Sequence, residues 1–393
     1  MLAEHAIETN VRREVSSERL HVVISKLDQP ESLQAIAAGW RDLESRSPNQ
    51  GLFNSVDWAI YVAHHFAGSK DRQIVVAEAF AGNRLVAIWP LAIRKHGGLN
   101  ILTSIGAPFD QYSEAMFAWD INPGPVIDRM VSELRKQISV DGLVLRKAKV
   151  SEPLYDELCQ KAYVIDHDDH APQIHLDPAK PFDEFLQKLN SKTRKNLRNY
   201  HNRLARQGTI EHVVIEGPQT ADLLAQCFDD RHAWLSDHGY SSEAFRDSHF
   251  KSFVTGLADH AESLGLVAFV LKVDGEVAAL QWGFVRGGCY YAFMSCRNAE
   301  FEQFSVGRVH LRYIIEFCHR TGLNTLDLMV PASSYKLNWT KTTEHVVDLI
   351  WPWTTKGFLV LDLVERKVRP VVKHWLNQTP QALRKPVMAM LNR

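Results

Sequence analysis

The stretch LGLVAFVLKVDGEVAALQWGFVRGGCYYAFMSC, residues 264–296, contains three apolar runs in close succession. Each run has the length and the content of β-branched and aromatic residues that are typical of a strand. Asp274 and Gly275 separate the first two runs, and an Asp-Gly pair is a strong short-range signal for a β-hairpin. We therefore expect three consecutive strands in this part of the chain.

A second stretch repeats this pattern in the first half of the sequence. EAFAGNRLVAIWPLAI, residues 78–93, again places a glycine turn between two apolar runs. Two expected helices precede each hairpin, and a further strand and helix follow it. The order predicts an α/β (α+β) fold of two similar units, each with a mixed, mostly antiparallel sheet flanked by helices. The expected organisation is a flexible arm at 1–19, an N-terminal unit at 20–178, a C-terminal unit at 179–355 and a basic helical segment at 356–393.

Composition and charge narrow the class of protein. Hydrophobic residues make up 45% of the 393 residues and charged residues 23%, as in ordinary globular proteins. Lys and Arg number 45 against 46 Asp and Glu, so the chain as a whole carries no basic signal for nucleic acid. Five cysteines without a Cys-x-x-Cys pair argue against a disulfide framework or a cysteine zinc site, and they predict a cytoplasmic location. We see no apolar core of a secretory signal and no apolar run of about 18 residues that would predict a membrane span.

Positive charge gathers in two places. Residues 188–206 hold seven Lys or Arg and no acidic residue, among them Arg194 and Arg198, which we assign to substrate binding. This face could bind a nucleotide-sugar diphosphate, the phosphates of CoA, a tRNA backbone or an anionic membrane; alternatively, it pairs with acidic residues upstream. Residues 356–393 hold eight basic and two acidic residues beside an apolar stripe, so this segment either contacts a membrane surface peripherally or docks on the protein itself.

The sequence lacks the motifs of several enzyme classes. There is no GxSxG elbow, P-loop or GxGxxG, which argues against a hydrolase, an NTPase and a dinucleotide-binding enzyme. His and Asp residues gather between 166 and 175, but no metal-ligand spacing such as HExxH accompanies them. We expect a polar loop there and no metal site.

Four stretches of the second half carry a resemblance to a known family. They are 191–198 followed by Gly208, the hairpin 273–279, the segment 304–308, and 326–328 followed by 335–339. In this order they resemble the GNAT acetyltransferases, and more narrowly the CelD-type or BioF-like family associated with cellulose and exopolysaccharide genes. The pair of units resembles the tandem arrangement of the FemAB-like proteins. The first half matches more weakly, through its hairpin and residues 110–112.

The resemblance implies where the substrates would bind. The donor would be acetyl-CoA or acyl-CoA, and no metal would be needed. The donor phosphates would lie at a helix start that has one glycine where GNAT domains have a glycine-rich loop, formed by Ser305, Val306, Gly307 and Arg308. Backbone groups of a central strand would face the thioester carbonyl, at Ala279, Leu280 and Gln281. Asp110 and Tyr112 would contact the acceptor.

Four side chains are candidates for catalysis by the same resemblance: Lys336, Asp327, Tyr335 and Tyr291. Lys336, next to Tyr335, would stabilise a developing oxyanion or a donor phosphate, or else be an exposed lysine on a short helix. Asp327 would act as a general base or hold the acceptor, and a tyrosine hydroxyl such as that of Tyr291 would protonate the leaving thiolate. A structural role as a strand residue is the alternative for both.

These features predict the transfer of an acetyl or acyl group from acyl-CoA to an amine or hydroxyl of a sugar, or of an envelope or exopolysaccharide precursor. Two alternatives stay open. One is a FemAB-like transferase that uses aminoacyl-tRNA, which is the one nucleic-acid partner we consider. The other is a non-catalytic GNAT pair that serves as a scaffold in polysaccharide biosynthesis. The expected location is the cytoplasm, including the periphery of the inner membrane.

Overall fold

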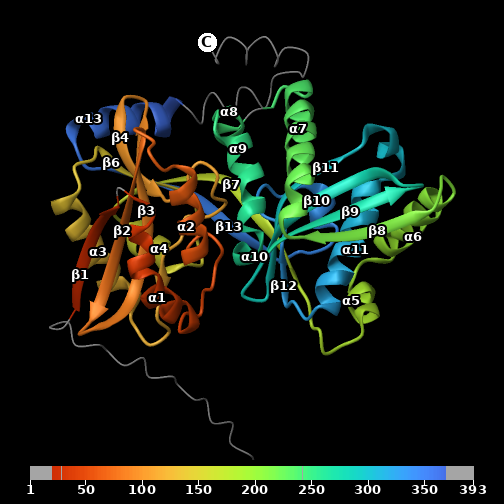
Figure 1. Ribbon diagram of the computed structural model, residues 1–393, viewed down its shortest axis with the longest axis horizontal. Helices are drawn as coiled ribbons and strands as arrows, with labels where there is room; N and C mark the ends of the chain where they lie inside the picture. Colours follow the sequence, from red (N-terminus) through yellow and green to blue (C-terminus); the bar gives the residue numbers. More distant parts are fainter. Residues whose placement is uncertain (1–19, 28, 241, 369–393) are drawn as a thin grey trace, which may run out of the picture.

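The computed structural model describes residues 20–27, 29–240 and 242–368. The arm expected at 1–19, the side chains of 364–368 and every residue from 369 onward lie outside the described part, and with them lies most of the apolar stripe expected near the C-terminus. Figure 1 shows two halves side by side, with the N-terminal half in red to yellow and the C-terminal half in green to blue.

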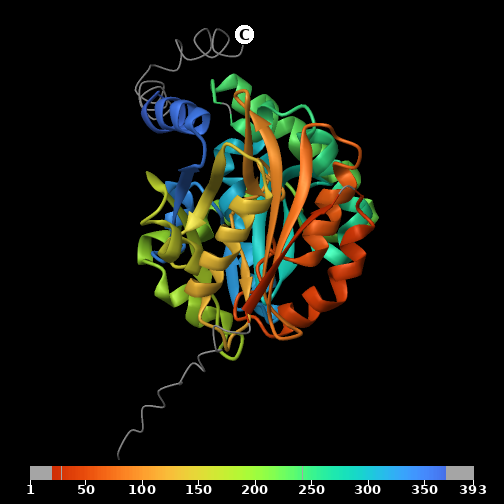
Figure 2. The same cartoon turned by 90° about the vertical axis from the view of Figure 1, so that its left-hand side faces the viewer.

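The N-terminal half begins with a strand and two helices and continues with a series of strands. Its elements are β1 (Leu20–Leu27), α1 (Ser32–Ser45), α2 (Val56–His65), β2 (Arg72–Ala81), β3 (Arg84–His96), β4 (Leu99–Ser104), β5 (Met116–Phe117), α3 (Pro123–Gln137), β6 (Gly142–Lys149), α4 (Pro153–Leu158) and β7 (Tyr163–His175). Helices α1 and α2 cover one face of this part of the sheet, and α3 and α4 cover the other (Figure 2).

The C-terminal half repeats this order after two additional helices. Its elements are α5 (Phe182–Lys188), α6 (Ser191–Ala205), β8 (Ile210–Glu216), η2 (Pro218–Thr220), α7 (Ala221–Asp237), α8 (Glu243–Arg246), α9 (Phe250–Gly256), η3 (Leu257–His260), α10 (Ala261–Leu264), β9 (Leu266–Val273), β10 (Glu276–Arg286), β11 (Cys289–Arg297), η4 (Ala299–Phe304), α11 (Val306–Arg320), β12 (Thr325–Asp327), α12 (Ser334–Leu337), β13 (Thr343–Pro352), α13 (Thr355–Gly357) and η5 (Phe358–Val368).

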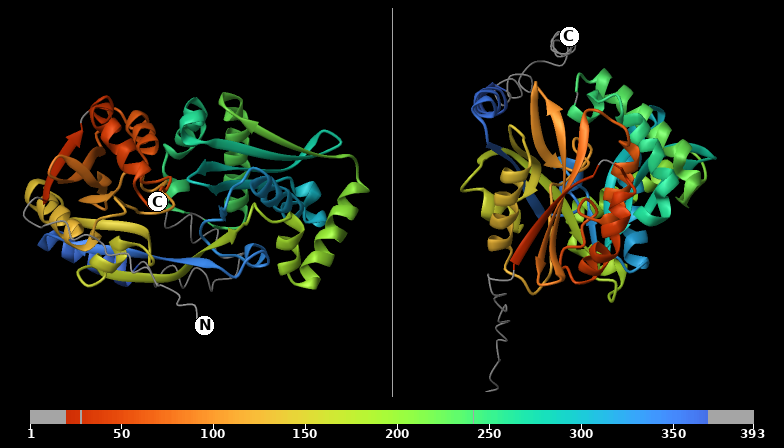
Figure 3. Two further views of the ribbon diagram at one scale, coloured as in Figure 1. Left: turned by 90° about the horizontal axis from the view of Figure 1, so that it is seen from below. Right: turned by 60° about the vertical axis from the view of Figure 1, so that its left-hand side comes forward.

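A 13-stranded sheet runs through both halves in the order β1-β2-β3-β4-β6-β13-β7-β12-β11-β10-β9-β8, with β5 paired to β3. Strand β7 joins the two parts, because residues 163–172 pair with β13 and residues 173–175 pair with β12. Strand β13 belongs to the C-terminal half in sequence but lies in the sheet of the N-terminal half, between β6 and β7. Figure 3 (left) shows β7 and β13 running side by side between the halves.

The polar loop expected at 166–175 is wrong, because these residues belong to strand β7. Most side chains of this strand are exposed or half-buried, so its polar residues remain in contact with water. Pairing of the backbone with β13 and β12 holds the strand in place without an apolar pattern.

Turn and cap residues explain where the predicted elements begin. Asp274 and Gly275 both have positive φ, 48° and 82°, as a type I′ hairpin turn requires. The side chain of Asn190 accepts a hydrogen bond from the backbone N–H of Thr193 and so caps the start of the basic helix α6.

Side chains of the C-terminal strands alternate between two helical layers. On β9, Val267 and Phe269 pack with α11, whereas Ala268 and Val270 belong to the core that contains α7 and α9. That second core continues into the N-terminal half. There Trp58 of α2 packs edge-on against Phe253 of α9, with ring centroids 5.7 Å apart. The two halves therefore share one hydrophobic core, and the expected mixed α/β architecture flanked by helices is confirmed.

Candidate functional site

Strands β11 and β12 run side by side for three residues and then separate. Residues 289–291 pair in parallel with 325–327, and within the described chain no strand lies beside β11 residues 292–297 on that edge. On its other edge β11 stays paired with β10 as far as Arg297. We call residues 292–297 the open edge of β11. An edge of this kind leaves backbone N–H and C=O groups free to bind a ligand.

Helix α11 begins just beyond the open edge of β11. Its cap residue Ser305 has a left-handed backbone, with φ of 57°. The first amides of a helix have no intrahelical acceptor and attract anions. A β-carbon added at Gly307 would meet no atom within 4 Å, so there is open space beside this residue in the first turn of the helix. Val306 is buried, whereas Gly307 is half-buried.

The basic helix α6 lies next to this helix start. Arg308 donates a hydrogen bond to the hydroxyl of Tyr200 on α6 at 3.3 Å, and Arg203 of α6 donates to the carbonyl of Gln303 at 3.3 Å. Figure 1 shows α5, α6 and α11 together at one end of the molecule. Free amides and guanidinium groups together make this a region that suits anionic groups such as phosphates.

The two arginines predicted from α6 have different surroundings. Arg194 donates to the carbonyls of Gln187, at 2.8 Å, and of Leu189, so it fixes the turn between α5 and α6. The side chain of Arg198 is exposed, and nothing in the described chain pairs with it. Arg198 therefore remains free for a ligand, whereas the donors of Arg194 serve the fold.

The backbone expected to face the thioester is fully paired. Ala279, Leu280 and Gln281 each have a partner on β9 and another on β11. The free backbone groups therefore lie on the open edge of β11, one strand away from the predicted position. All three side chains are buried, and the amide nitrogen of Gln281 has no hydrogen-bond partner among the described residues.

Asp327 and Tyr112, predicted separately, meet at the seam between the halves. The hydroxyl of Tyr112 contacts both carboxylate oxygens of Asp327, at 2.9 and 3.0 Å, and the backbone N–H of Met329 donates to the same carboxylate at 2.7 Å. Burial raises the pKa of Asp327. Both side chains are buried, so this pair joins the N-terminal loop to the end of β12 and positions it.

Lys336 holds the segment that follows β12. Its ammonium group donates to the carbonyls of Leu328, Met329 and Pro331 at 2.8, 2.9 and 2.9 Å. All three of its donors are therefore used within the protein. Burial lowers the pKa of Lys336 to about 8, although the charge of Asp327 opposes the shift.

The two predicted tyrosines differ in access to a ligand. Tyr291 is buried and packs edge-on against Phe53 of the N-terminal half, with ring centroids 6.4 Å apart. Tyr335 is half-buried on α12, and burial raises the pKa of its hydroxyl, which keeps it neutral and able to donate a proton. Tyr335 is therefore the more exposed of the two.

Asp110 serves the fold of the N-terminal half. One carboxylate oxygen accepts from the indole N–H of Trp58 at 2.8 Å, and the other accepts from the backbone N–H of Gly106 at 2.9 Å. A β-carbon at Gly106 would lie 2.1 Å from the Asp110 carboxylate, so glycine is required there. Burial raises the pKa of Asp110 to about 6, although these hydrogen bonds oppose the shift.

A group of charged residues at the seam was not predicted. Lys149 lies 4.3 Å from the ring centre of Tyr112 and forms an ion pair with Glu114 at 2.6 Å. The other carboxylate oxygen of Glu114 is buried without a described partner. Nearby, Asn49 donates to Glu152 at 2.9 Å. Their positions in the sequence are far apart, so no spacing indicates this group; the position of Glu114 two residues after Tyr112 is the one local signal.

The N-terminal half fills the position that is open in the C-terminal half. Strands β4 and β6 pair in parallel only at 101–102 with 142–143 and then separate. Here the chain between β4 and β5 returns to β6, where Ser113 donates from its hydroxyl to the carbonyl of Arg146 at 2.6 Å and from its backbone to Lys147 at 3.4 Å. The edge of β6 is thus occupied by the protein's own loop.

Two further searches concern the described residues alone. No group of three or more His, Cys, Asp or Glu side chains in this part of the chain could hold a metal ion. None of the described helices is long and apolar enough to span a bilayer.

Comparisons with known proteins identify the C-terminal unit. Residues 191–337 match the family model described as an acetyltransferase (GNAT) domain. The match covers the basic helix α6, the open edge of β11, the start of α11 and Lys336. No curated protein matches the sequence.

Solved structures resemble the fold of the whole chain. The crystal structure of FemX superposes with a TM-score of 0.56 at 11% identity, over 84% of this chain and 98% of that chain. A conserved protein of unknown function from Bacteroides thetaiotaomicron VPI-5482 superposes with a TM-score of 0.50 at 12% identity, over 84% of this chain and all of the other. The predicted fold, two tandem GNAT-like units, is confirmed.

Proposed function

We propose that this protein transfers an acetyl or acyl group from acyl-CoA to an amine or hydroxyl of a sugar, or of an envelope or exopolysaccharide precursor, as in the CelD-type family. One observation carries the proposal: the GNAT match at 191–337 coincides with an unpaired strand edge next to an open helix start. The reaction would take place in the cytoplasm, with the basic segment 356–393 touching the inner membrane.

One group of residues would hold the donor, and another would polarise its carbonyl group. The start of α11, with Arg308 and the exposed cations of α6, would hold the phosphates. Acyl-CoA would supply the thioester, whose C–S bond breaks as a C–N or C–O bond to the acceptor forms. Backbone N–H groups on the open edge of β11 would bind the carbonyl oxygen as charge develops there. The neutral Tyr335 hydroxyl would donate its proton to the leaving thiolate and would regain one from the acceptor.

Aminoacyl-tRNA is the second candidate donor. The exposed cations of α6 support it, since Lys192, Lys195, Arg198 and Arg206 have no ion pair within the described residues and could follow a phosphate backbone. The third hypothesis, a scaffold without catalysis, predicts no donor binding at all.

A glycine substitution tests the donor site without disturbing the fold. Gly307→Ala adds a methyl group in the first turn of α11, where no side chain or other part of the described protein lies within 4 Å. We expect stability to stay equal or to rise by up to about 1 kcal/mol, because alanine favours helix over glycine. Calorimetric affinity for acetyl-CoA should fall at least about tenfold, equivalent to a loss of about 1.4 kcal/mol.

The matched control is Gly39→Ala in helix α1, where an added β-carbon is also free of clashes, with the nearest atom 3.9 Å away. Its affinity for acetyl-CoA should equal that of the unchanged protein. If Gly307→Ala binds acetyl-CoA normally, or if no acyl-CoA binds while a charged tRNA does, acyl-CoA is not the donor held at α11.

A further inference from the structure

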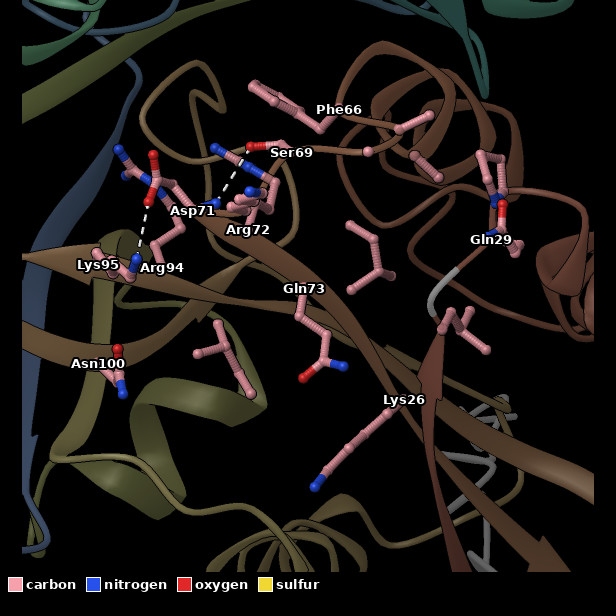
Figure 4. Close-up of a pocket in the computed structure, with 18 of the residues that line it drawn as sticks. Lys26, Gln29, Phe66, Ser69, Asp71, Arg72, Gln73, Arg94, Lys95 and Asn100 are labelled. Atoms are coloured by element: carbon pink, nitrogen blue, oxygen red, sulfur yellow. Dashed lines mark hydrogen bonds and ion pairs between the residues drawn. The ribbon is translucent and has the colours of Figure 1, made fainter.

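A cavity in the N-terminal half lies apart from the open edge of β11. Its volume is about 520 Å³, within the range of small-molecule sites. It is bordered by the end of β1, the start of β2, the end of β3 and the chain between α2 and β2 (Figure 4). Few of its lining side chains are large and apolar, so it does not suit a lipid or an aromatic ligand.

The charge of the lining is one-sided. Five cationic side chains border the cavity against the single carboxylate of Asp71: Lys26, Lys70, Arg72, Arg94 and Lys95. Lys95 pairs with Asp71 at 3.1 Å, whereas Lys26 and Lys70 are exposed and have no ion-pair partner in the described chain. Amide and hydroxyl groups complete the lining, at Gln29, Ser69, Gln73, Asn100 and Ser139.

Arg72 places a fixed positive charge in the wall. Its guanidinium donates to the carbonyls of Ile105 and Ala107 and lies 3.8 Å from the ring centre of Phe66. These carbonyls are neutral, and the carboxylates of Asp110 and Asp247, which lie outside the lining, balance its charge in part. Burial, and after it the charge of Arg94, lowers the pKa of Arg72 to about 9.

The positive charge of Arg94 is balanced by carboxylates at long ion-pair distances. Its nearest carboxylates are Glu243 at 3.6 Å and Asp247 at 3.8 Å, both from the C-terminal half. Two arginines and two unpaired lysines thus surround one space, and a ligand with several negative charges would offset the repulsion between them.

We propose that this cavity binds a small, multiply charged anion, a phosphorylated or polycarboxylate metabolite, at a site separate from the donor site. Several cations spread around the cavity suit more than one anionic group on the same molecule. The proposal does not depend on the acyl-transfer function.

The test uses inorganic pyrophosphate and citrate as probes in calorimetric titrations of the full-length protein. We expect saturable binding of at least one probe that weakens with added salt. The variant Lys26→Ala/Lys70→Ala should lose at least about tenfold in affinity, or about 1.4 kcal/mol. A preference for pyrophosphate would identify a phosphate ester as the ligand class, and a preference for citrate a polycarboxylate.

Two control variants separate this site from other positive surfaces. Lys136→Ala/Lys341→Ala removes the same charge from exposed positions elsewhere, and Arg308→Ala removes the cation at α11. The lysine control should bind the probes as the unchanged protein does, and Arg308→Ala should keep the binding that the Lys26→Ala/Lys70→Ala variant loses. Loss of binding in Arg308→Ala with normal binding in the Lys26/Lys70 variant would assign the anion to α11 and overturn the proposal. The absence of saturable binding up to about 10 mM probe, a concentration far above the dissociation constant of a specific site, would also overturn the proposal.

Discussion

Lys336 shows how a residue with a catalytic appearance can serve the fold. Its three hydrogens meet three carbonyl oxygens at 2.8–2.9 Å, which closes the segment after β12 around one ammonium group. This segment also contains Met329, whose N–H donates to Asp327 at 2.7 Å. The ammonium group therefore holds the backbone of this segment in position.

We expect Lys336→Met to lower the free energy of unfolding by about 2–3 kcal/mol, because three backbone carbonyls, two of them in buried residues, lose a charged donor. Urea unfolding followed by circular dichroism measures this change. Lys341→Met, an exposed lysine a few residues further on, should change stability by less than about 0.5 kcal/mol. Full stability combined with lost acyl transfer in Lys336→Met would instead place the ammonium group in direct contact with a substrate.

Glu152 gives the seam a pH dependence near neutrality. Burial and the charge of Glu114 raise its pKa to about 7, whereas an unfolded glutamate titrates near 4.3. The folded state disfavours the ionised form, so stability is full below the unfolded pKa and is lost as pH rises toward 7.

We therefore expect Glu152→Gln, which stays neutral, to gain stability relative to the unchanged protein between roughly pH 5 and pH 8. The gain should be on the order of 2 kcal/mol, since each unit of pKa shift corresponds to about 1.4 kcal/mol and Glu152 keeps some contact with water. Urea unfolding at both pH values measures it. Glu316→Gln, on the exposed part of α11, should show no such difference; an equal response in both variants would contradict the assignment to Glu152.

Sequence reasoning found Asp327 and Tyr112 but not the hydrogen bond between them. They lie 215 residues apart, and no periodicity links a loop of one half to a strand end of the other. Lys149 and Glu114 were not predicted either, because no periodicity in the sequence links their positions. The free backbone groups were predicted on β10 but lie on β11, and this error has another cause. The sequence pattern predicts a strand at 276–286 but does not indicate which two neighbouring strands of the sheet separate.

At the scale of elements, each half contains a pair of parallel strands that diverge, but the described chain fills the space between the strands in only one half. In each half two parallel strands pair briefly and diverge, β4 with β6 and β11 with β12. In the N-terminal half the protein's own loop occupies the edge, with Ser113 bonded to the backbone of Arg146. In the C-terminal half the edge of β11 stays free within the described chain.

This difference predicts one donor site per chain despite two similar units. Calorimetry with acetyl-CoA should give a stoichiometry of one, and Gly307→Ala should weaken all of the observed binding rather than half of it. The control for active concentration is a titration of Gly39→Ala, which should give the same stoichiometry. A stoichiometry of two, with one site insensitive to position 307, would mean that the loop 105–115 leaves the N-terminal edge.

The hairpins were predictable because a glycine turn requires positive φ and the flanking strands are apolar, as at Asp274 and Gly275. Strand β7 was not, since its sequence YVIDHDDHAPQIH has neither an apolar run nor a regular alternation. What makes it a strand is the backbone pairing with β13, a partner about 180 residues later in the chain. A contact of that kind leaves no local trace in composition.

At the scale of the molecule, chain order and spatial order disagree at one strand. β13 follows the GNAT domain in sequence yet lies between β6 and β7 in the N-terminal sheet. Its residues Val346, Val347, Leu349 and Ile350 are buried there. Full burial of four such side chains contributes roughly 6–12 kcal/mol, which is comparable to the net stability of a whole domain. The two units on either side of the boundary expected near residue 178 therefore depend on each other for stability.

We expect the fragments 1–178 and 179–393 to fail to fold when expressed separately. The first would lack the strand between β6 and β7, and the second would expose β13 together with the face of α9 that packs on Trp58. Size-exclusion chromatography and thermal unfolding would show aggregated or non-cooperative material for each. Co-expression is the matched control, because both fragments together can restore the sheet and should elute as one complex with cooperative unfolding. A soluble, cooperatively unfolding fragment 179–393 that binds acetyl-CoA would show that the GNAT domain is independent and that β13 is a detachable tie between the halves.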